Sequence, residues 1–255
     1  MKIGVLVKQV PDTETKIKIS SDQKNIDEAG IKWVINPYDE IAVEQALKLK
    51  EQVGGEVIII SAGPARAQEA IRQALAMGAD SGIHINTQND ILDVFATANI
   101  LTAAIKTSQF EIIFTGKQAV DDDNAQVHIA VAEKLGWPHI SPVEKFSFKE
   151  NSVEVQRPVS GGTKEIISVP LPVVIGCEKG LNEPRYPSLP GIMKAKSKPL
   201  EELKATDLLE NPAKKLNILS YSLPPERTAG KIIEGEPEQA AAELVRLLRE
   251  EAKVI

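Results

Sequence analysis

The chain has 255 residues, of which 42% are hydrophobic and 26% are charged, so it is long enough to bury a substantial globular core. Its net charge of −6 at pH 7 and its 4% aromatic content exclude the basic surface and the stacking platforms of a nucleic-acid-binding protein. Cys177 is the only cysteine, which excludes an intrachain disulfide and fits a reducing compartment.

The N-terminal residues enter an apolar segment at once, and they contain no pattern of a cleaved leader or an organelle-targeting segment. No apolar run approaches the roughly 20 residues that span a bilayer. The sequence therefore predicts a soluble, cytoplasmic protein without direct membrane insertion.

The first 140 residues alternate short apolar runs, rich in β-branched residues, with amphipathic helical patterns. Strands are predicted at residues 3–7, 57–60, 83–85 and 112–114. Helices are predicted at residues 41–49, 67–77 and 91–105, and glycines follow the first two at positions that suit a helix end. Strands separated by helices indicate βαβ units and a parallel sheet with right-handed crossovers.

The pattern changes after Pro138, where short strands follow one another without helices between them. These strands are predicted at residues 143–148, 153–157, 165–169 and 173–177. We interpret them as antiparallel hairpins that extend the sheet. The predicted fold class is α/β, a parallel-sheet domain with an antiparallel β extension.

The remaining residues have little apolar periodicity of their own until a helical pattern at residues 237–251, which places Leu244, Leu247 and Leu248 on one face. We predict two parts: an α/β nucleotide-binding domain at residues 1–200, which includes a docking loop at 177–199, and a C-terminal arm and helix at 201–255. Because the arm has little core of its own, we expect it to pack on a partner subunit.

Residues 115–127, Thr-Gly-Lys-Gln-Ala-Val-Asp-Asp-Asp-Asn-Ala-Gln-Val, are the most informative segment. An apolar run precedes them and a helical pattern begins near Asn124, which is the layout of a phosphate site in an α/β sheet. The segment matches neither a P-loop nor a dinucleotide fingerprint. We interpret Asp121, Asp122 and Asp123 as loop-capping residues rather than metal ligands, and expect backbone N–H groups to hold a phosphate with help from Lys117.

Two further polar segments follow predicted strands. Asn36-Pro-Tyr-Asp39 is, as local structure, an ordinary helix cap with proline in the first turn, but its place after a strand allows a second role toward a ligand. Ser61-Ala-Gly-Pro64 lies after another strand. Loops at the carboxyl ends of parallel strands converge on one crevice, so the three segments together predict nucleotide binding.

No catalytic constellation can be assembled from the sequence. His84, His128 and His139 are scattered without ligand or triad spacing, and Cys177 has no neighbouring base. No Gly-x-Ser-x-Gly, HExxH or CxxC motif is present. We therefore expect no catalytic residue and no metal site, and a binding or carrier subunit rather than a self-sufficient enzyme.

A second candidate site is a protein docking surface within residues 181–196. The segment combines four large apolar residues with basic neighbours at Arg185, Lys194 and Lys196. An apolar anchor with a polar rim is typical of a small interface with a partner that is released quickly. The predicted anchors are Tyr186, Leu189, Ile192 and Met193.

Several of these segments resemble the β subunit of electron transfer flavoproteins, from residue 1 to about residue 230. The matching pieces are residues 7–10, 36–44, 74–80, 116–119 with the aspartates that follow, 181–196 and 227–230. The resemblance implies an adenine nucleotide α-hydrolase-like domain in a heterodimer with an α subunit, which holds most of one FAD. It also implies electron transfer, as in fatty acid oxidation, from acyl-CoA or related dehydrogenases to a quinone oxidoreductase or another acceptor.

In this family the β subunit buries an AMP that has no redox role. By position, the resemblance places Tyr38 near the flavin ring and makes Leu189 the anchoring leucine of a recognition loop at residues 177–199. The residues that it places around the nucleotide are Leu6, Asn36, Pro37, Tyr38, Asp39, Ala62, Gly116, Lys117, Gln118, Ala119, Val120, Asp121, Asp122, Asp123, Asn124, Ala125, Gln126 and Val127.

Some residues depart from the mitochondrial-type pattern. Thr13 stands where those members have a tyrosine, and Ala125-Gln-Val127 is similar to the electron-bifurcating branch, in which a second FAD replaces AMP and NADH is oxidised. Asp122, however, occupies a position where that branch has a glycine that leaves room for the larger ligand. Ser160 replaces an acidic residue of the family signature. AMP is the preferred prediction and a second FAD the alternative; a nucleotide-sensing domain similar to universal stress proteins is a third.

Overall fold

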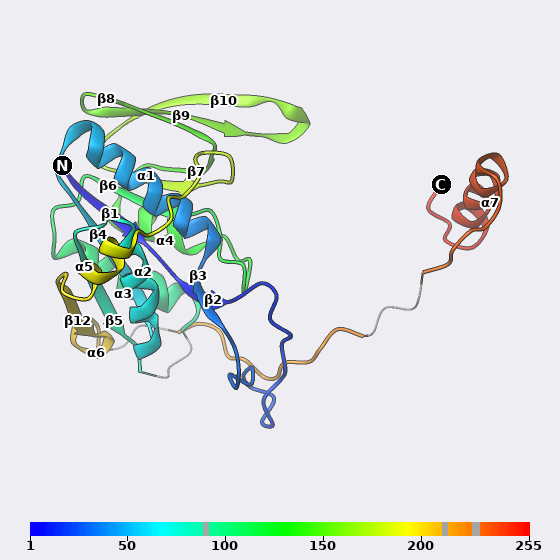
Figure 1. The fold of residues 1–255 in the computed structure, drawn as a ribbon, viewed down its shortest axis with the longest axis horizontal. Helices are drawn as coiled ribbons and strands as arrows, with labels where there is room; N and C mark the ends of the chain where they lie inside the picture. Colours follow the sequence, from blue (N-terminus) through cyan, green and yellow to red (C-terminus); the bar gives the residue numbers. More distant parts are fainter. Residues whose placement is uncertain (89–91, 211–213, 226–229) are drawn as a thin grey trace. The chain divides into compact units, whose positions relative to one another are not determined.

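The computed structural model describes residues 1–88, 92–210, 214–225 and 230–255 (Figure 1). The chain forms two compact units. The larger unit contains residues 1–17 and 27–219, and the smaller contains residues 18–26 and 220–255. The residues predicted to bind a nucleotide and the four predicted docking anchors belong to the larger unit, whereas the predicted arm is divided between the two units.

A seven-stranded sheet forms the centre of the larger unit, and every neighbouring pair of its strands runs parallel. In sheet order the strands are β12 (Leu200–Lys204), β5 (Ser81–Asn86), β4 (Glu56–Gly63), β1 (Lys2–Leu6), β6 (Ile112–Gly116), β11 (Val173–Cys177) and β7 (His139–Val143). The four strands predicted within the first 140 residues are confirmed as β1, β4, β5 and β6.

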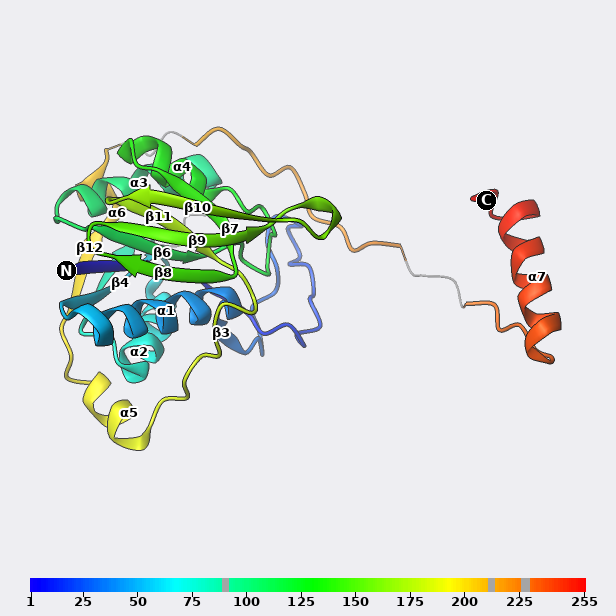
Figure 2. The ribbon, with the colours of Figure 1, turned by 90° about the horizontal axis from the view of Figure 1, so that it is seen from above.

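Helices cover both faces of this sheet, as Figure 2 shows. The main ones are α1 (Pro37–Val53) and α2 (Gln68–Met77) on one face, and α3 (Val94–Lys106) and α4 (Val127–Leu135) on the other. Successive residues of β4 alternate between the two cores, with Val57 and Ile59 packed toward α1 and α2 and Ile58 and Ile60 toward α3 and α4. A strand buried on both faces needs such an uninterrupted apolar run, and this is why β4 could be predicted from the sequence.

The shorter helices are η1 (Ala65–Ala67), η2 (Ser160–Gly162), α5 (Leu189–Ala195) and α6 (Ala205–Leu208). The helix predicted at residues 67–77 is confirmed as α2, and α5 lies within the docking segment. The predicted helix at residues 91–105 is observed from Val94, and its predicted start at Ile91 lies outside the described residues.

The antiparallel part is a separate three-stranded sheet of β8 (Lys145–Lys149), β9 (Ser152–Pro158) and β10 (Lys164–Pro170). It packs beside α1, where Val153 and Val155 join the core on that face. The prediction that residues 173–177 belong to these hairpins is wrong, because β11 lies in the parallel sheet between β6 and β7. All five residues of β11 are buried, and that continuous burial belongs to a central strand rather than to a one-sided hairpin.

A short hairpin follows β1. Strand β2 (Gln9–Pro11) pairs antiparallel with β3 (Trp33–Ile35), outside the large sheet. The segment at Asn36 therefore does not follow a strand of the parallel sheet, as the prediction of three parallel strand exits assumed. The hairpin instead returns the chain to the end of β1, where the Asn36 N–H donates to the Lys8 carbonyl at 2.9 Å.

The predicted arm begins with ordered structure in the larger unit, because β12 is an edge strand beside β5. In the smaller unit, Ile19 bridges to Ile26, the Tyr221 N–H donates to the Gln23 carbonyl, and α7 (Pro237–Glu250) is the predicted last helix. Leu244 and Val245 of α7 are exposed within this unit, whereas Leu247 is buried. None of the described helices is long and apolar enough to cross a membrane.

Candidate functional site

The ends of β4, β1 and β6 lie side by side at the carboxyl edge of the sheet. Leu6 pairs with Ile60 of β4, and Val5 pairs with Phe114 of β6. Leu6, Ala62 and Gly116, which were predicted from different parts of the sequence, therefore lie on three adjacent strands. A parallel sheet of this kind binds ligands at this edge, where the loops leave the strands.

Asn36 connects the start of α1 to the loop after β6. Its side-chain Nδ2 donates to the Gln118 carbonyl at 2.8 Å, and its Oδ1 accepts from the Val120 N–H at 3.2 Å. Asn36 is the N-cap residue of α1 with proline in the first turn, as predicted, but its side chain makes no helix-capping hydrogen bond. A fully buried amide needs partners, and here both of its ends are used to hold residues 118–120 in place.

Asp39, in the first turn of α1, joins two strand ends through hydrogen bonds. Its Oδ2 accepts from the Lys8 N–H at 2.7 Å, and its Oδ1 accepts from the Gly116 N–H at 3.0 Å. Burial raises the pKa of this carboxyl from 3.8 to about 7, although the hydrogen bonds from Asn36, Lys8 and Gly116 act to lower it. The ionised form of Asp39 at neutral pH therefore lowers the stability of the folded protein at the junction of β1, β6 and α1.

We expect Asp39→Asn to change how stability depends on pH. The Asp39 carboxyl ionises near 3.8 in the unfolded chain and near 7 in the folded one, so its contribution is fully present below pH 4 and is lost as the pH rises through 7. The loss approaches about 4 kcal/mol, the free-energy equivalent of that difference in pKa. Urea unfolding midpoints from pH 4 to 8 should therefore fall less steeply in the variant.

Asp12→Asn is the matched control, because Asp12 is only partly buried and its hydrogen bond from Lys32 lowers its pKa. A carboxyl with a lowered pKa loses its stabilising contribution only as the pH falls below its unfolded value of 3.8, so the profiles of the wild type and Asp12→Asn should be nearly parallel from pH 4 to 8. Parallel stability profiles of the wild type and Asp39→Asn over this pH range would contradict the assignment of Asp39 as a buried, costly carboxylate.

The three aspartates after β6 do not cap α4, but Asp121 and Asp122 cap the loop by accepting from the N–H groups of Asp122 and Asn124. The helix begins at Val127, and its N-cap residue, Gln126, makes no side-chain cap. Asp121 and Asp122 also accept from Lys8 Nζ at 2.8 and 3.1 Å. These carboxylates raise the pKa of Lys8 above its usual value, although burial acts to lower it.

The loop is held by further internal bonds and contains unusual backbone conformations. Asp123 accepts from Gln118 Nε2 at 2.7 Å. Asp123 and Ala125 both have φ of 50°, a left-handed conformation that residues other than glycine rarely adopt. Strained residues of this kind cluster at ligand-binding sites, and turns that include them point successive N–H groups toward one side.

Tyr38 and Lys117 face each other across the same edge. Lys117 Nζ lies 5.1 Å from the centre of the Tyr38 ring and forms an ion pair with Glu178 at 2.6 Å. Hydrogen bonding to Glu178 raises the pKa of Lys117, so the amine stays protonated beside the ring. This places a cation, an aromatic ring and a carboxylate together at the exits of β6 and β11.

The sequence reasoning did not single out Lys8 and Glu178. Lys8 occurs in the Val7-Lys-Gln-Val10 motif, and a lysine directly after a buried strand is a signal that could have been used. Glu178 follows β11, whose place next to β6 was not predicted. Of the remaining predicted residues, Pro37 and Val127 begin α1 and α4, and Ala119, Asn124 and Gln126 lie in the loop before α4.

The four predicted anchors of the docking segment project from the larger unit. The exposed fractions are 96% for Tyr186, 80% for Leu189, 44% for Ile192 and 65% for Met193. Large apolar side chains gathered at such exposure mark an interaction surface. Ser188 caps α5 by accepting from the Gly191 N–H.

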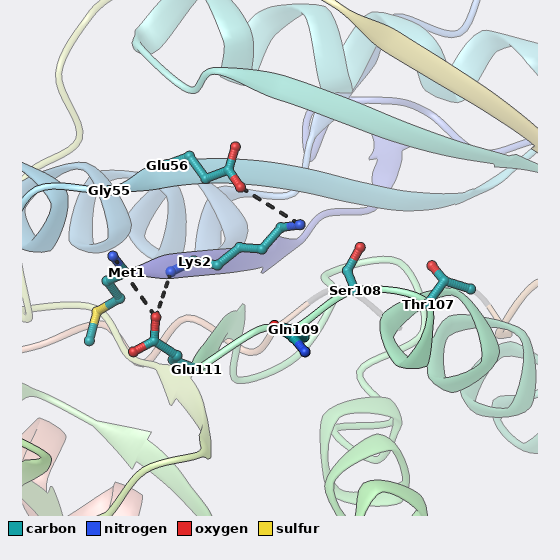
Figure 3. Close-up of a pocket in the computed structure, with 8 residues that line it drawn as sticks. All are labelled: Met1, Lys2, Gly55, Glu56, Thr107, Ser108, Gln109 and Glu111. Atoms are coloured by element: carbon teal, nitrogen blue, oxygen red, sulfur yellow. Dashed lines mark hydrogen bonds and ion pairs between the residues drawn. The ribbon is translucent and has the colours of Figure 1, made fainter.

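An open hollow lies at the opposite, amino edge of the sheet, lined by residues that include Met1, Lys2, Glu56 and Glu111 (Figure 3). Its charges are already paired, because the Lys2 N–H donates to Glu111 at 2.9 Å and the Lys2 amine lies 3.7 Å from Glu56. Within the described residues, no group of three potential ligands is arranged to hold a metal ion. The hollow therefore offers no unpaired charge to a charged ligand.

The fold and the loops at its carboxyl edge define an α/β protein of the parallel-sheet class whose members bind ligands where the strands end. A sequence model of the electron transfer flavoprotein domain matches residues 23–208. The chain is 43% identical over 260 residues to electron transfer flavoprotein subunit beta of Bacillus subtilis, with both chains covered completely. It is 40% identical to the mitochondrial subunit beta of Arabidopsis thaliana, again over both full lengths.

The human subunit beta is 39% identical over 238 residues, which cover 92% of this chain and 93% of the human one. The chain belongs to the electron transfer flavoprotein family, among its β subunits. This membership implies an α-subunit partner and, in general, an association with flavin.

Proposed function

We propose that this chain is the AMP-binding β subunit of a heterodimeric electron transfer flavoprotein. It helps to hold the FAD of the α subunit, accepts electrons from flavin dehydrogenases such as acyl-CoA dehydrogenases, and passes them to a quinone oxidoreductase or another acceptor. The observation that carries the proposal is the junction at Asn36 and Asp39, which joins the ends of β1 and β6 to the loop at residues 116–127.

The residues at this junction fit an adenosine phosphate. The first-turn N–H groups of α4 have no partner within the helix and no side-chain cap, so they can donate to a phosphate. Lys8 pairs with Asp121 and Asp122, and its one positive charge offsets one of their two negative charges, which reduces the repulsion that these carboxylates would exert on an anion. Leu6 and Ala62 supply apolar contacts of the kind that an adenine ring needs.

FAD supplies the electron-carrying chemistry when the heterodimer is assembled, and residues of this chain border it. Tyr38 offers an aromatic face at the edge of the β subunit, and the Lys117–Glu178 pair fixes a positive charge beside that face. The C-terminal arm and α7 are proposed to pack on the α subunit, because the apolar residues Leu244 and Val245 are exposed within their own unit.

A second candidate function is electron bifurcation, with a second FAD in place of AMP and NADH as the donor. Thr13 and the Ala125-Gln-Val127 run favour this alternative. Asp122 favours AMP, because its ion pair with Lys8 keeps a charged side chain where a larger ligand would need space.

The test is the nucleotide content of the co-expressed αβ complex, released by denaturation and separated by chromatography. We expect one FAD and one AMP per heterodimer, and no flavin reduction when NADH is added. Two FAD molecules without AMP would overturn the carrier proposal and establish the bifurcating one.

A further inference from the structure

The docking segment carries its apolar anchors on a helix that cannot be stable alone. Helix α5 has seven residues, far fewer than an isolated helix needs in water. Helix α5 must therefore be stabilised by the rest of the larger unit. The hydrogen bonds that do so lie on both sides of the anchors in the sequence.

On the N-terminal side of the anchors, Arg185 forms hydrogen bonds with the buried carboxylate of Glu44 on α1. Its Nε and Nη2 donate to the two oxygens of Glu44 at 2.7 and 3.0 Å, its backbone N–H adds a third bond at 3.2 Å, and its Nη1 donates to Glu51 at 2.6 Å. The Glu44 side chain is only 3% exposed. A buried carboxylate is costly without a partner, so Glu44 holds Arg185 firmly in this geometry.

On the C-terminal side, the segment is fastened to α2. Arg72 Nη1 donates to the carbonyls of Ala195 and Lys198 at 2.6 and 2.8 Å. Lys198 Nζ donates to the carbonyls of Leu75 and Ala79 at the end of α2. Gly191 passes so close to α2 that a Cβ there would lie 2.5 Å from the Ala76 carbonyl oxygen.

We propose that Arg185 is a positioning residue for partner docking, and that its pair with Glu44 pre-organises the anchors between the two attachments. Tyr186 directly follows Arg185, and Leu189 begins α5, so both start from a fixed backbone. Docking a segment that is already ordered costs less conformational entropy than ordering it on contact. This inference rests on the proposed function, because it assigns a role within the same docking event.

The test is Arg185→Lys in the co-expressed αβ complex. Lysine keeps the charge but cannot form the planar two-oxygen contact with Glu44. We expect amide hydrogen exchange of residues 186–195 to become about tenfold faster, in line with the loss of about one strong hydrogen bond. With an acyl-CoA dehydrogenase and its acyl-CoA as donor, the KM for the complex should rise about tenfold, while kcat at saturation and flavin content stay unchanged.

Arg157→Lys is the matched control, because Arg157 forms an arginine–glutamate ion pair with Glu165 between β9 and β10 of the antiparallel sheet, which belongs neither to the docking segment nor to α7. It should alter neither exchange in the docking segment nor KM. The positioning role of Arg185 would be overturned if Arg185→Lys left hydrogen exchange unchanged, or if exchange became faster without a rise in KM. Loss of flavin from the Arg185→Lys complex would overturn it as well. A different outcome would contradict the proposed function itself: neither the wild-type complex nor the Leu189→Ala complex accepts electrons from the dehydrogenase. In that case the exchange experiment still decides whether Arg185 orders the docking segment.

Discussion

Gly116→Ala is expected to lower the thermal midpoint of the protein by about 9 °C. A Cβ at position 116 would overlap Asp39 Oδ1 and lie 2.7 Å from Tyr38 Cβ, so the start of α1 would have to move away from the end of β6. Overpacking of this kind costs about 3 kcal/mol, and a chain of this size loses about 3 °C for each kcal/mol. Because the same displacement separates Asn36 from Gln118 and Val120, we also expect the complex to retain less nucleotide.

Gly63→Ala provides the comparison, since Gly63 also ends a strand at the carboxyl edge, but its Cβ would meet only the Ala67 methyl group, at 3.1 Å. Calorimetry of both variants should show a much smaller effect for Gly63→Ala. Equal midpoints for Gly116→Ala and the wild type would mean that α1 and β6 are not in tight contact at this point.

Leu189→Ala is expected to raise the KM of the αβ complex as acceptor for an acyl-CoA dehydrogenase by roughly 30-fold, the equivalent of about 2 kcal/mol for an interface anchor. Leu189 is 80% exposed, so its truncation removes a contact with the partner and leaves the core intact. Steady-state kinetics and the flavin spectrum of the complex measure the two effects separately, and the flavin content should be unchanged.

Ile166→Ala is the control for that variant. Ile166 is a similarly exposed aliphatic residue, but it lies on β10 of the antiparallel sheet. Its truncation should leave the KM for the dehydrogenase unaltered. A KM equal to that of the wild type in Leu189→Ala would rule out Leu189 as the anchor.

Much of the fold could be predicted because local pattern and tertiary role coincide in the first 140 residues. Strands such as Val57–Ile60 are apolar throughout because both of their faces are covered, and glycine residues follow α1 and α2 where those helices end. The error at residues 173–177 arose because a short apolar strand gives no information about its neighbour. Its insertion between β6 and β7 depends on contacts that are distant in the sequence.

The structure brings together the two loop segments that were predicted to lie near a ligand, but through side-chain contacts that were not predicted. Residues 36–39 and 116–127 were identified as loop segments near a ligand, and the structure brings them together through the side chains of Asn36 and Asp39. Asp121 and Asp122 were interpreted as loop-capping residues, and they do accept from the N–H groups of Asp122 and Asn124, but their ion pairs with Lys8 were not predicted. An aspartate forms either interaction equally well, so its partner depends on which charged side chain the fold brings within reach.

The sequence by itself determined the alternation of strands and helices, the loops that leave the strands and the apolar anchors at Tyr186 and Leu189, because each of these is encoded by residues close together in the chain. Only the tertiary structure decided that Asp39 joins Lys8 to Gly116 and that Glu44 holds Arg185, 141 residues away in the sequence. The physical reason is that a buried carboxylate needs partners, and the packing of α1 against the strand ends and against the docking segment selects which donors are near enough to serve.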